Sequence, residues 1–99
     1  MTARTFTLRN ESGLHARPAA RFVQAAAILT SDVEVENLDR PGGRGVNGKS
    51  ILEVLTLGAS AGQRIRVTTR GEQEAADLEL LARLIESGFG EAPVQHLQS

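Results

Sequence analysis

The sequence predicts an α+β fold in which amphipathic strands form a sheet and helices cover one of its faces. Residues 4–9, 32–38 and 64–70 alternate between apolar and polar side chains, which is typical of strands that bury one face. Residues 16–29 and 72–87 carry apolar side chains at helical spacing. Because alternating strands leave one face polar, they favour an antiparallel sheet that is open to solvent on one side.

The first strand, 4–9, places Phe6 and Leu8 on one face and polar side chains on the other. We therefore expect these two apolar side chains to be buried. The strand is followed by residues 10–13, Asn-Glu-Ser-Gly, which have the composition of a turn.

The helix expected over 16–29 is rich in alanine, the residue with the highest helix propensity. Pro18 is compatible with its first turn, because an amide missing there costs no intrahelical hydrogen bond. The residues expected to form its apolar stripe are Phe22, Val23, Ala26 and Ala27.

The second strand is expected over 32–38. The residues expected on its buried face are Val33 and Val35. On its open face, cross-strand ion pairs are expected from Glu34 and Glu36 to Arg64 and Arg66. Residues 39–45 contain one proline and three glycines, which predicts a loop that includes part of a short edge strand.

A short helix is expected over 48–57, with Asn47 as its N-cap and Gly58 as its C-terminal stop. Ser50 then lies near the third helical position. The apolar residues wrap too far around this helix to form one buried stripe, so we expect some of them to be exposed. These residues are Ile51, Leu52, Val54 and Leu55.

The third clear strand, 64–70, is expected to bury Ile65 and Val67. The last helix, 72–87, has its acidic residues near the N-terminus, as the helix dipole favours, and Gly88 as its stop. Its buried stripe is expected to be Ala75, Leu78, Leu81, Ala82 and Ile85.

The composition narrows the class of protein. The 99 residues, 1–99, are expected to form one domain, and residues 93–99, which show no periodicity, a frayed tail. The absence of cysteine excludes disulfides and thiolate metal sites. A formal net charge of −1 and only three aromatic residues argue against a nucleic-acid binder. No metal-ligand cluster, signal peptide or membrane span is apparent, so we expect a cytoplasmic protein.

Residues 10–23, NESGLHARPAARFV, carry the most chemical information. His15 stands directly before the expected helix, and Arg17 follows two residues later. The first amides of a helix have no intrahelical partner, and the helix dipole favours anions at that end. A nucleophilic imidazole, free amides and a guanidinium therefore surround one point, which predicts that His15 carries a phosphoryl group. A lone histidine is more often structural, and it is the helix start and Arg17 that favour the functional interpretation.

Two segments resemble the HPr family, the histidine-containing phosphocarriers of bacterial sugar phosphotransferase systems. Residues 13–20, GLHARPAA, resemble the active-site signature of that family, and residues 48–59, GKSILEVLTLGA, resemble its regulatory serine segment. The resemblance covers about residues 3–88. It implies an open-faced β-sandwich, in which a four-stranded antiparallel sheet of order 1-4-2-3 carries three helices on one face.

For the histidine segment, the resemblance implies that His15 accepts a phosphoryl group on Nδ1 from phosphorylated enzyme I and passes it to enzyme IIA domains. Arg17 and the amides of Ala16 and Arg17 would contact the phosphoryl group, and Ser12 matches a position where a short polar side chain assists. Such a protein is a carrier and not an enzyme, because its partners supply the catalytic machinery. It needs no cofactor, and we expect a monomer.

For the serine segment, the resemblance implies that HPr kinase/phosphorylase phosphorylates Ser50. A phosphate there would place about −1.5 to −2 charge beside a docking surface, so Ser50→Asp is expected to slow phosphotransfer to His15. The residues expected to contact partner proteins are Ala20, Ile51, Leu52 and Leu55. Segment 38–45 is longer than usual in the family and richer in glycine and arginine.

Several alternatives stay open. The carrier could serve a nitrogen-regulatory branch of the family or a dihydroxyacetone kinase instead of sugar uptake. It could also be a regulatory binding module that acts through Ser50. Residues 43–50 satisfy the Walker A pattern, but a proline and two glycines interrupt the approach and the following helix is short, so nucleotide hydrolysis is disfavoured.

Overall fold

The structure is a computed structural model that describes residues 1–91. Residues 93–99, expected to form a frayed tail, lie outside the described residues. The elements along the chain are β1 (Thr2–Thr7), α1 (Ala16–Ala27), β2 (Asp32–Asn37), β3 (Val46–Asn47), α2 (Ile51–Leu55), β4 (Arg64–Arg70), α3 (Glu74–Glu86) and the 3-10 helix η1 (Gly88–Gly90). This order confirms the predicted succession of strands and helices.

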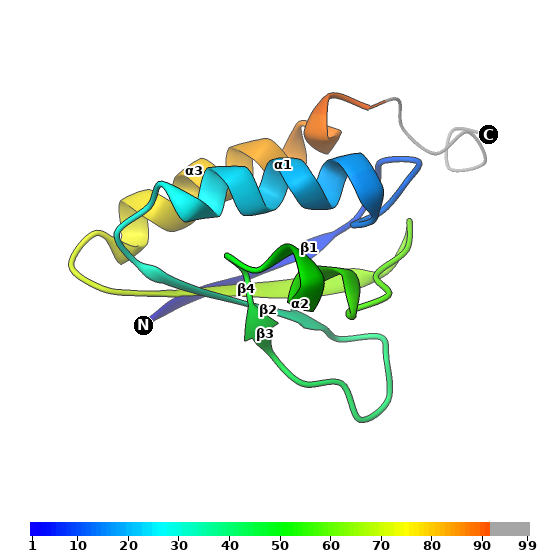
Figure 1. Ribbon diagram of the computed structural model, residues 1–99, viewed down its shortest axis with the longest axis horizontal. Helices are drawn as coiled ribbons and strands as arrows, with labels where there is room; N and C mark the ends of the chain where they lie inside the picture. Colours follow the sequence, from blue (N-terminus) through cyan, green and yellow to red (C-terminus); the bar gives the residue numbers. More distant parts are fainter. Residues whose placement is uncertain (92–99) are drawn as a thin grey trace.

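The four strands form one antiparallel sheet in the order β1-β4-β2-β3. Helices α1 and α3 pack against each other and lie along the same face of the sheet (Figure 1). Helix α2 contacts α1 and the edge strand β3. The structure therefore confirms the expected open-faced β-sandwich with three helices. Within residues 1–91, none of the helices has the length and apolar character that crossing a membrane requires.

The core fills the space between the sheet and the helices. It includes the strand residues Phe6, Val33, Val35, Ile65 and Val67 and the helix residues Phe22, Leu78, Leu81 and Ile85. Burial of one such side chain contributes about 1.5–3 kcal/mol. The predicted buried faces of all three long strands are thus confirmed, because alternation alone decides which side chains a half-buried strand can bury.

The open face of the sheet carries ion pairs, which only partly match those predicted from Glu34 and Glu36 to Arg64 and Arg66. Arg66 contacts Glu36 at 2.7 Å, as expected. Arg64 instead contacts Asp39 at 2.9 Å, because the antiparallel register places Glu34 opposite Thr68 and moves Arg64 beyond the end of β2. In these exposed positions the pairs contribute little to stability individually.

The short helix begins later than predicted. Its range is Ile51–Leu55, and Asn47, expected as its N-cap, lies in β3. The amide of Gly48 donates to the Val33 carbonyl at 2.8 Å, which continues the sheet pairing past Asn47. A Cβ on Gly48 would lie 2.6 Å from the Val33 side chain. Residue 48 is therefore part of the sheet edge, and Ser50 is the N-cap of α2.

Smaller differences concern element ends. Strand β1 begins two residues earlier than expected, because Thr2 already pairs with Thr69 of β4. Ala27 and Ala75, expected in the apolar stripes, are exposed. Ala27 lies in the last turn of α1 and Ala75 in the first turn of α3, where the helix ends pass beyond the core.

Candidate phosphoryl-acceptor site

His15 is the N-cap residue of α1, with an extended backbone (φ −121°, ψ 163°). Its side chain is half-buried and makes no capping hydrogen bond to its own helix. The first turn of α1 contains no acidic residue. The His15 side chain therefore does not cap the amides of Ala16 and Arg17, which have no intrahelical acceptor. That these amides bind a phosphoryl group stays a prediction.

The turn before His15 depends on Gly13, which has φ +61°. The amide of Leu14 donates to the Ala59 carbonyl at 2.9 Å. A Cβ on Gly13 would lie 2.7 Å from that same carbonyl oxygen, closer than side-chain carbons approach. Glycine is therefore required both for the left-handed conformation and for the contact between this turn and the loop that contains Ala59.

Ala16, directly after His15, has φ +43°, in the left-handed region that residues other than glycine rarely adopt. This conformation costs about 1–2 kcal/mol for an alanine. Strained residues of this kind concentrate at functional sites. Arg17, which follows Ala16, is exposed.

Ser60 is a neighbour of His15 that the sequence analysis missed. Its Oγ lies 3.5 Å from Nε2 of the imidazole. Ser60 belongs to the loop between α2 and β4, and 45 residues separate it from His15. No local pattern could have revealed this contact, because it depends on how two loops meet.

Glu91 is a second residue that the sequence analysis missed. Its carboxylate accepts hydrogen bonds from Asn10 Nδ2 at 2.9 Å and from the Ser12 hydroxyl at 2.9 Å. Hydrogen bonds from Asn10, then those from Ser12, and the charge of Arg17 lower the pKa of Glu91. The expected phosphate ligand Ser12 thus binds a carboxylate in this structure.

The C-terminal turn brings Glu91 to this position. Gly88 has φ +71° and ends α3, as predicted. Phe89, which follows, is buried, with 1% of its surface exposed. Arg21 of α1 donates a hydrogen bond to the Phe89 carbonyl. The described end of the chain is therefore attached to α1 through Arg21 and, through Glu91, to the turn that precedes His15.

Ser50 lies at the start of α2, and its Oγ accepts a hydrogen bond from the Glu53 amide at 3.3 Å. The predicted position near the third helical residue is thus wrong. The Ser-x-x-Glu pattern of residues 50–53 is the sequence signal for the N-cap, although the Glu53 carboxylate here accepts a hydrogen bond from the Asn47 amide. Three apolar side chains of α2 are exposed: Ile51 by 37%, Leu52 by 76% and Leu55 by 40%. We call these three residues the α2 patch. Ala20 of α1, also predicted to contact partners, is half-buried.

Comparisons with known proteins identify the family. A family model described as "PTS HPr component phosphorylation site" matches residues 2–87. The chain belongs to the HPr family. A phosphocarrier protein HPr of Pseudomonas putida is 40% identical over 91 residues, which are 92% of this chain and 98% of the relative. A crystal structure of HPr from Thermoanaerobacter tengcongensis superposes with a TM-score of 0.85 at 40% identity, covering 93% of this chain and 99% of the other.

The HPr family consists of phosphocarriers of the phosphotransferase system, which is the class that the sequence predicts. Some relatives are much longer. A multiphosphoryl transfer protein of Haemophilus influenzae is 40% identical over 87 residues, which are 88% of this chain but 17% of that protein. The chain spans less than a quarter of the multiphosphoryl transfer proteins that it matches.

The Walker A pattern of residues 43–50 lacks the topology of a phosphate-binding loop in this HPr fold. Within the motif, Val46–Asn47 forms β3, which pairs antiparallel with β2. The helix that follows has five residues. A phosphate-binding loop instead connects a strand directly to a helix whose amides face the phosphates, so this motif match is coincidental.

Proposed function

We propose that this chain is a phosphocarrier that accepts a phosphoryl group on His15 from phosphorylated enzyme I and passes it to enzyme IIA domains. The observation that carries the proposal is the N-cap position of His15, where the imidazole leaves the first amides of α1 uncapped. Arg17 adds a permanent positive charge at the same helix end. The resemblance of residues 13–20 to the family signature supports the same assignment.

The interaction free energies expected at this helix end favour a site that binds a phosphoryl group reversibly. The dipole of α1 contributes about 0.3–1 kcal/mol to an exposed anion. Each charge-assisted hydrogen bond, from the amides of Ala16 and Arg17 or from the guanidinium, contributes about 1.5–3 kcal/mol. Hydrogen bonds therefore dominate over the dipole. Because the site is half-exposed, a second protein can reach the phosphoryl group and remove it.

Ser50 is proposed as the regulatory phosphorylation site, with HPr kinase/phosphorylase as the enzyme. As the N-cap of α2, a phosphorylated Ser50 would remain favourable for the helix, because its charge lies at the positive end. The same charge of about −1.5 to −2 would stand beside the α2 patch. Docking of an apolar partner surface would then be weakened, while the fold is retained.

The decisive experiment is incubation of the chain with phosphoenolpyruvate and enzyme I. A carrier gains one phosphate that is labile in acid and stable in base, as a phosphohistidine is. His15→Ala should gain none, and Arg17→Ala should gain it more slowly. If the unsubstituted chain stays unphosphorylated, the carrier function is wrong, and a binding module that acts through Ser50 becomes the better interpretation.

A second experiment addresses the branch that the carrier serves. The phosphorylated chain is offered to a sugar-specific enzyme IIA domain, to a nitrogen-regulatory IIA domain and to a dihydroxyacetone kinase system, and loss of phosphate from His15 is followed. We expect the fastest transfer to the sugar-specific domain. Faster transfer to either of the others would assign the chain to that branch.

A further inference from the structure

We propose that Ser60 is a positioning residue for His15, whose hydroxyl accepts the Nε2–H of the imidazole and keeps the proton away from Nδ1. The inference deepens the proposed function and rests on it: the family resemblance already implies that Nδ1 receives the phosphoryl group, and the new assignment is the role of Ser60. Ser60 lies outside the two segments that resemble the HPr family, residues 13–20 and 48–59.

The two ring nitrogens of His15 differ in their surroundings. Nε2 lies 3.5 Å from Ser60 Oγ. Within residues 1–91, no other side-chain hydrogen bond or ion pair involves the imidazole. In a neutral imidazole, one nitrogen carries the proton and the other carries the lone pair. The Ser60 hydroxyl can accept a hydrogen bond from Nε2–H or donate one to an Nε2 lone pair. Only the first arrangement leaves the Nδ1 lone pair free to attack phosphorus, and it is the proposed one.

A distance of 3.5 Å is at the long end of the hydrogen-bond range. Hydrogen bonds of reactive groups are often long in unliganded proteins and shorten when the reacting partner is bound. His15 and Ser60 are also placed by their neighbours. The amide of Leu14 donates to the Ala59 carbonyl at 2.9 Å, so a backbone hydrogen bond joins the residues directly before each of them.

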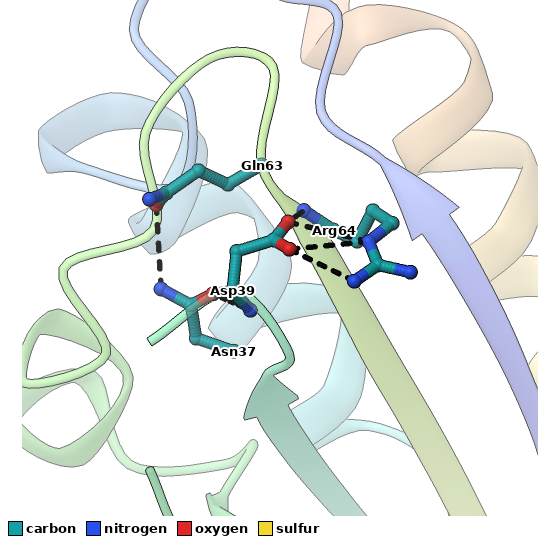
Figure 2. A network of polar contacts seen from close by, with 4 residues as sticks. All are labelled: Asn37, Asp39, Gln63 and Arg64. Carbon is teal, nitrogen blue, oxygen red and sulfur yellow. Dashed lines mark hydrogen bonds and ion pairs between the residues drawn. The ribbon is translucent and has the colours of Figure 1, made fainter. Parts of the chain in front are cut away.

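Ser60 is held from its other side by Gln63. The Ser60 amide donates to Gln63 Oε1 at 2.9 Å, and the Gln63 amide donates back to the Ser60 carbonyl at 3.0 Å. Asn37, at the end of β2, donates to the same Gln63 oxygen at 3.3 Å (Figure 2). The loop that carries Ser60 is therefore closed on itself and fastened to the sheet.

Further hydrogen bonds and an ion pair hold the start of β4, directly after this loop. Asp39 accepts a hydrogen bond from the Arg64 amide at 2.6 Å and forms an ion pair with the Arg64 guanidinium (Figure 2). The Asp39 amide donates to Asn37 Oδ1 at 3.0 Å. These bonds connect the residue that follows Gln63 to the end of β2. Because these hydrogen bonds already fix the loop, its Ser60 hydroxyl can orient the imidazole with little further loss of conformational entropy.

In the proposed transfer step, Nδ1 of His15 displaces the donor atom from phosphorus. The Nδ1 lone pair forms a bond to the phosphorus of an activated phosphoryl donor, and the bond from phosphorus to the donor atom breaks with its electron pair returning to the donor. The ring keeps its Nε2–H and becomes a positively charged phosphoimidazolium, so the hydrogen bond to Ser60 becomes charge-assisted and stronger. When the phosphoryl group leaves, the N–P electron pair returns to Nδ1 and the neutral ring is restored.

The test compares Ser60→Ala with Ser60→Thr, which keeps the hydroxyl. Ser60 is exposed, so neither substitution removes core packing. The first measurement is the ¹⁵N chemical shifts of the His15 ring at a pH where the ring is neutral. We expect the unsubstituted chain and Ser60→Thr to carry the proton on Nε2, and Ser60→Ala to show a larger share of the Nδ1–H form.

The second measurement is the second-order rate constant for phosphotransfer from phosphorylated enzyme I. Loss of one hydrogen bond predicts a decrease of roughly three- to tenfold for Ser60→Ala, with near-normal transfer by Ser60→Thr. Unchanged ring shifts in Ser60→Ala, or a threonine that fails to restore transfer, would overturn the role of Ser60. If the unsubstituted chain is not phosphorylated, the proposed function fails, and the ring shifts still decide whether Ser60 sets the proton position.

Discussion

Glu91 and Ser12 are joined by two hydrogen bonds, from the Ser12 amide at 3.2 Å and from its hydroxyl at 2.9 Å. The described end of the chain therefore occupies both donors of a residue that is proposed to assist phosphate binding. Asn10 donates a third hydrogen bond to the same carboxylate at 2.9 Å. Phosphate binding by Ser12 would therefore require that the Glu91 carboxylate give up these two Ser12 donors.

Replacement of Glu91 by Gln is expected to destabilise the fold in a pH-dependent way. Hydrogen bonds from Asn10 and Ser12 lower the pKa of Glu91 in the folded state, whereas an unfolded glutamate has a pKa of about 4.3. Its stabilising contribution is thus complete above that value and is lost as the pH falls through the lower folded pKa.

Urea denaturation of Glu91→Gln and the unsubstituted chain checks this expectation. At pH 7 the variant should be less stable by about 1 kcal/mol, and at pH 3 the difference should be smaller. Glu11→Gln is the matched control, because Glu11 is exposed and adjacent to Ser12. A difference that stays constant between the two pH values would contradict the assignment of the effect to the carboxylate.

Gly13→Ala is expected to be far more destabilising than Gly42→Ala. Both glycines have similar backbone angles, with φ +61° and φ +70°. An alanine in this region costs about 1–2 kcal/mol at either position. Only at Gly13 does the added Cβ meet a neighbour, the Ala59 carbonyl oxygen at 2.7 Å, whereas Gly42 has nothing within 4 Å.

The collision adds about 1–3 kcal/mol to the cost at Gly13. Urea denaturation measures both variants, and phosphorylation of His15 should also slow in Gly13→Ala, because the turn and the Ser60 loop are pushed apart. Equal destabilisation by the two alanines would show that the close approach of the loops contributes nothing to the fold.

The features that could be predicted from the sequence are those encoded over short distances along the chain. Alternation identified the buried faces of three strands, because Val33 and Val35, or Ile65 and Val67, differ from their neighbours within two residues. His15 and Arg17 were recognisable because the start of a helix brings neighbours in sequence to one point. The residues that the sequence predicts for phosphoryl binding thus lie in one contiguous segment, 12–17.

The features that could not be predicted depend on long-range contacts or on competing local signals. Ser60 contacts His15, which lies 45 residues earlier in the chain. Glu91 contacts Ser12, which lies 79 residues earlier. The start of α2 was misplaced because Asn47 and Ser50 are both good N-cap residues. Pairing of Gly48 with Val33 decided in favour of Ser50, and that pairing is set by the sheet.

Ser50→Asp is expected to slow phosphotransfer from enzyme I to His15 several-fold without weakening the fold. Serine, asparagine and aspartate are all favourable N-cap residues, so stability should change by less than about 0.5 kcal/mol. Ser50→Asn is the matched control, since it keeps the cap and lacks the charge. If both variants slow transfer equally, the effect comes from the side-chain shape and not from charge, and the regulatory role of phosphorylation loses its physical basis.

Leu52→Ala tests whether the α2 patch is a docking surface. Leu52 is 76% exposed, and Leu80 on α3 is 55% exposed. Truncation of either side chain should change the free energy of unfolding by less than about 0.5 kcal/mol, because exposed side chains contribute little to the core.

The two leucine variants should differ in phosphotransfer. An apolar side chain buried at the centre of an interface contributes about 1–2 kcal/mol to binding, so transfer at low enzyme I concentration should fall roughly five- to thirtyfold in Leu52→Ala. Leu80→Ala should transfer normally. At saturating enzyme I the rate of Leu52→Ala should recover, because the substitution changes docking and leaves the His15 chemistry intact. A deficit that persists at saturation would instead place Leu52 in the transfer step.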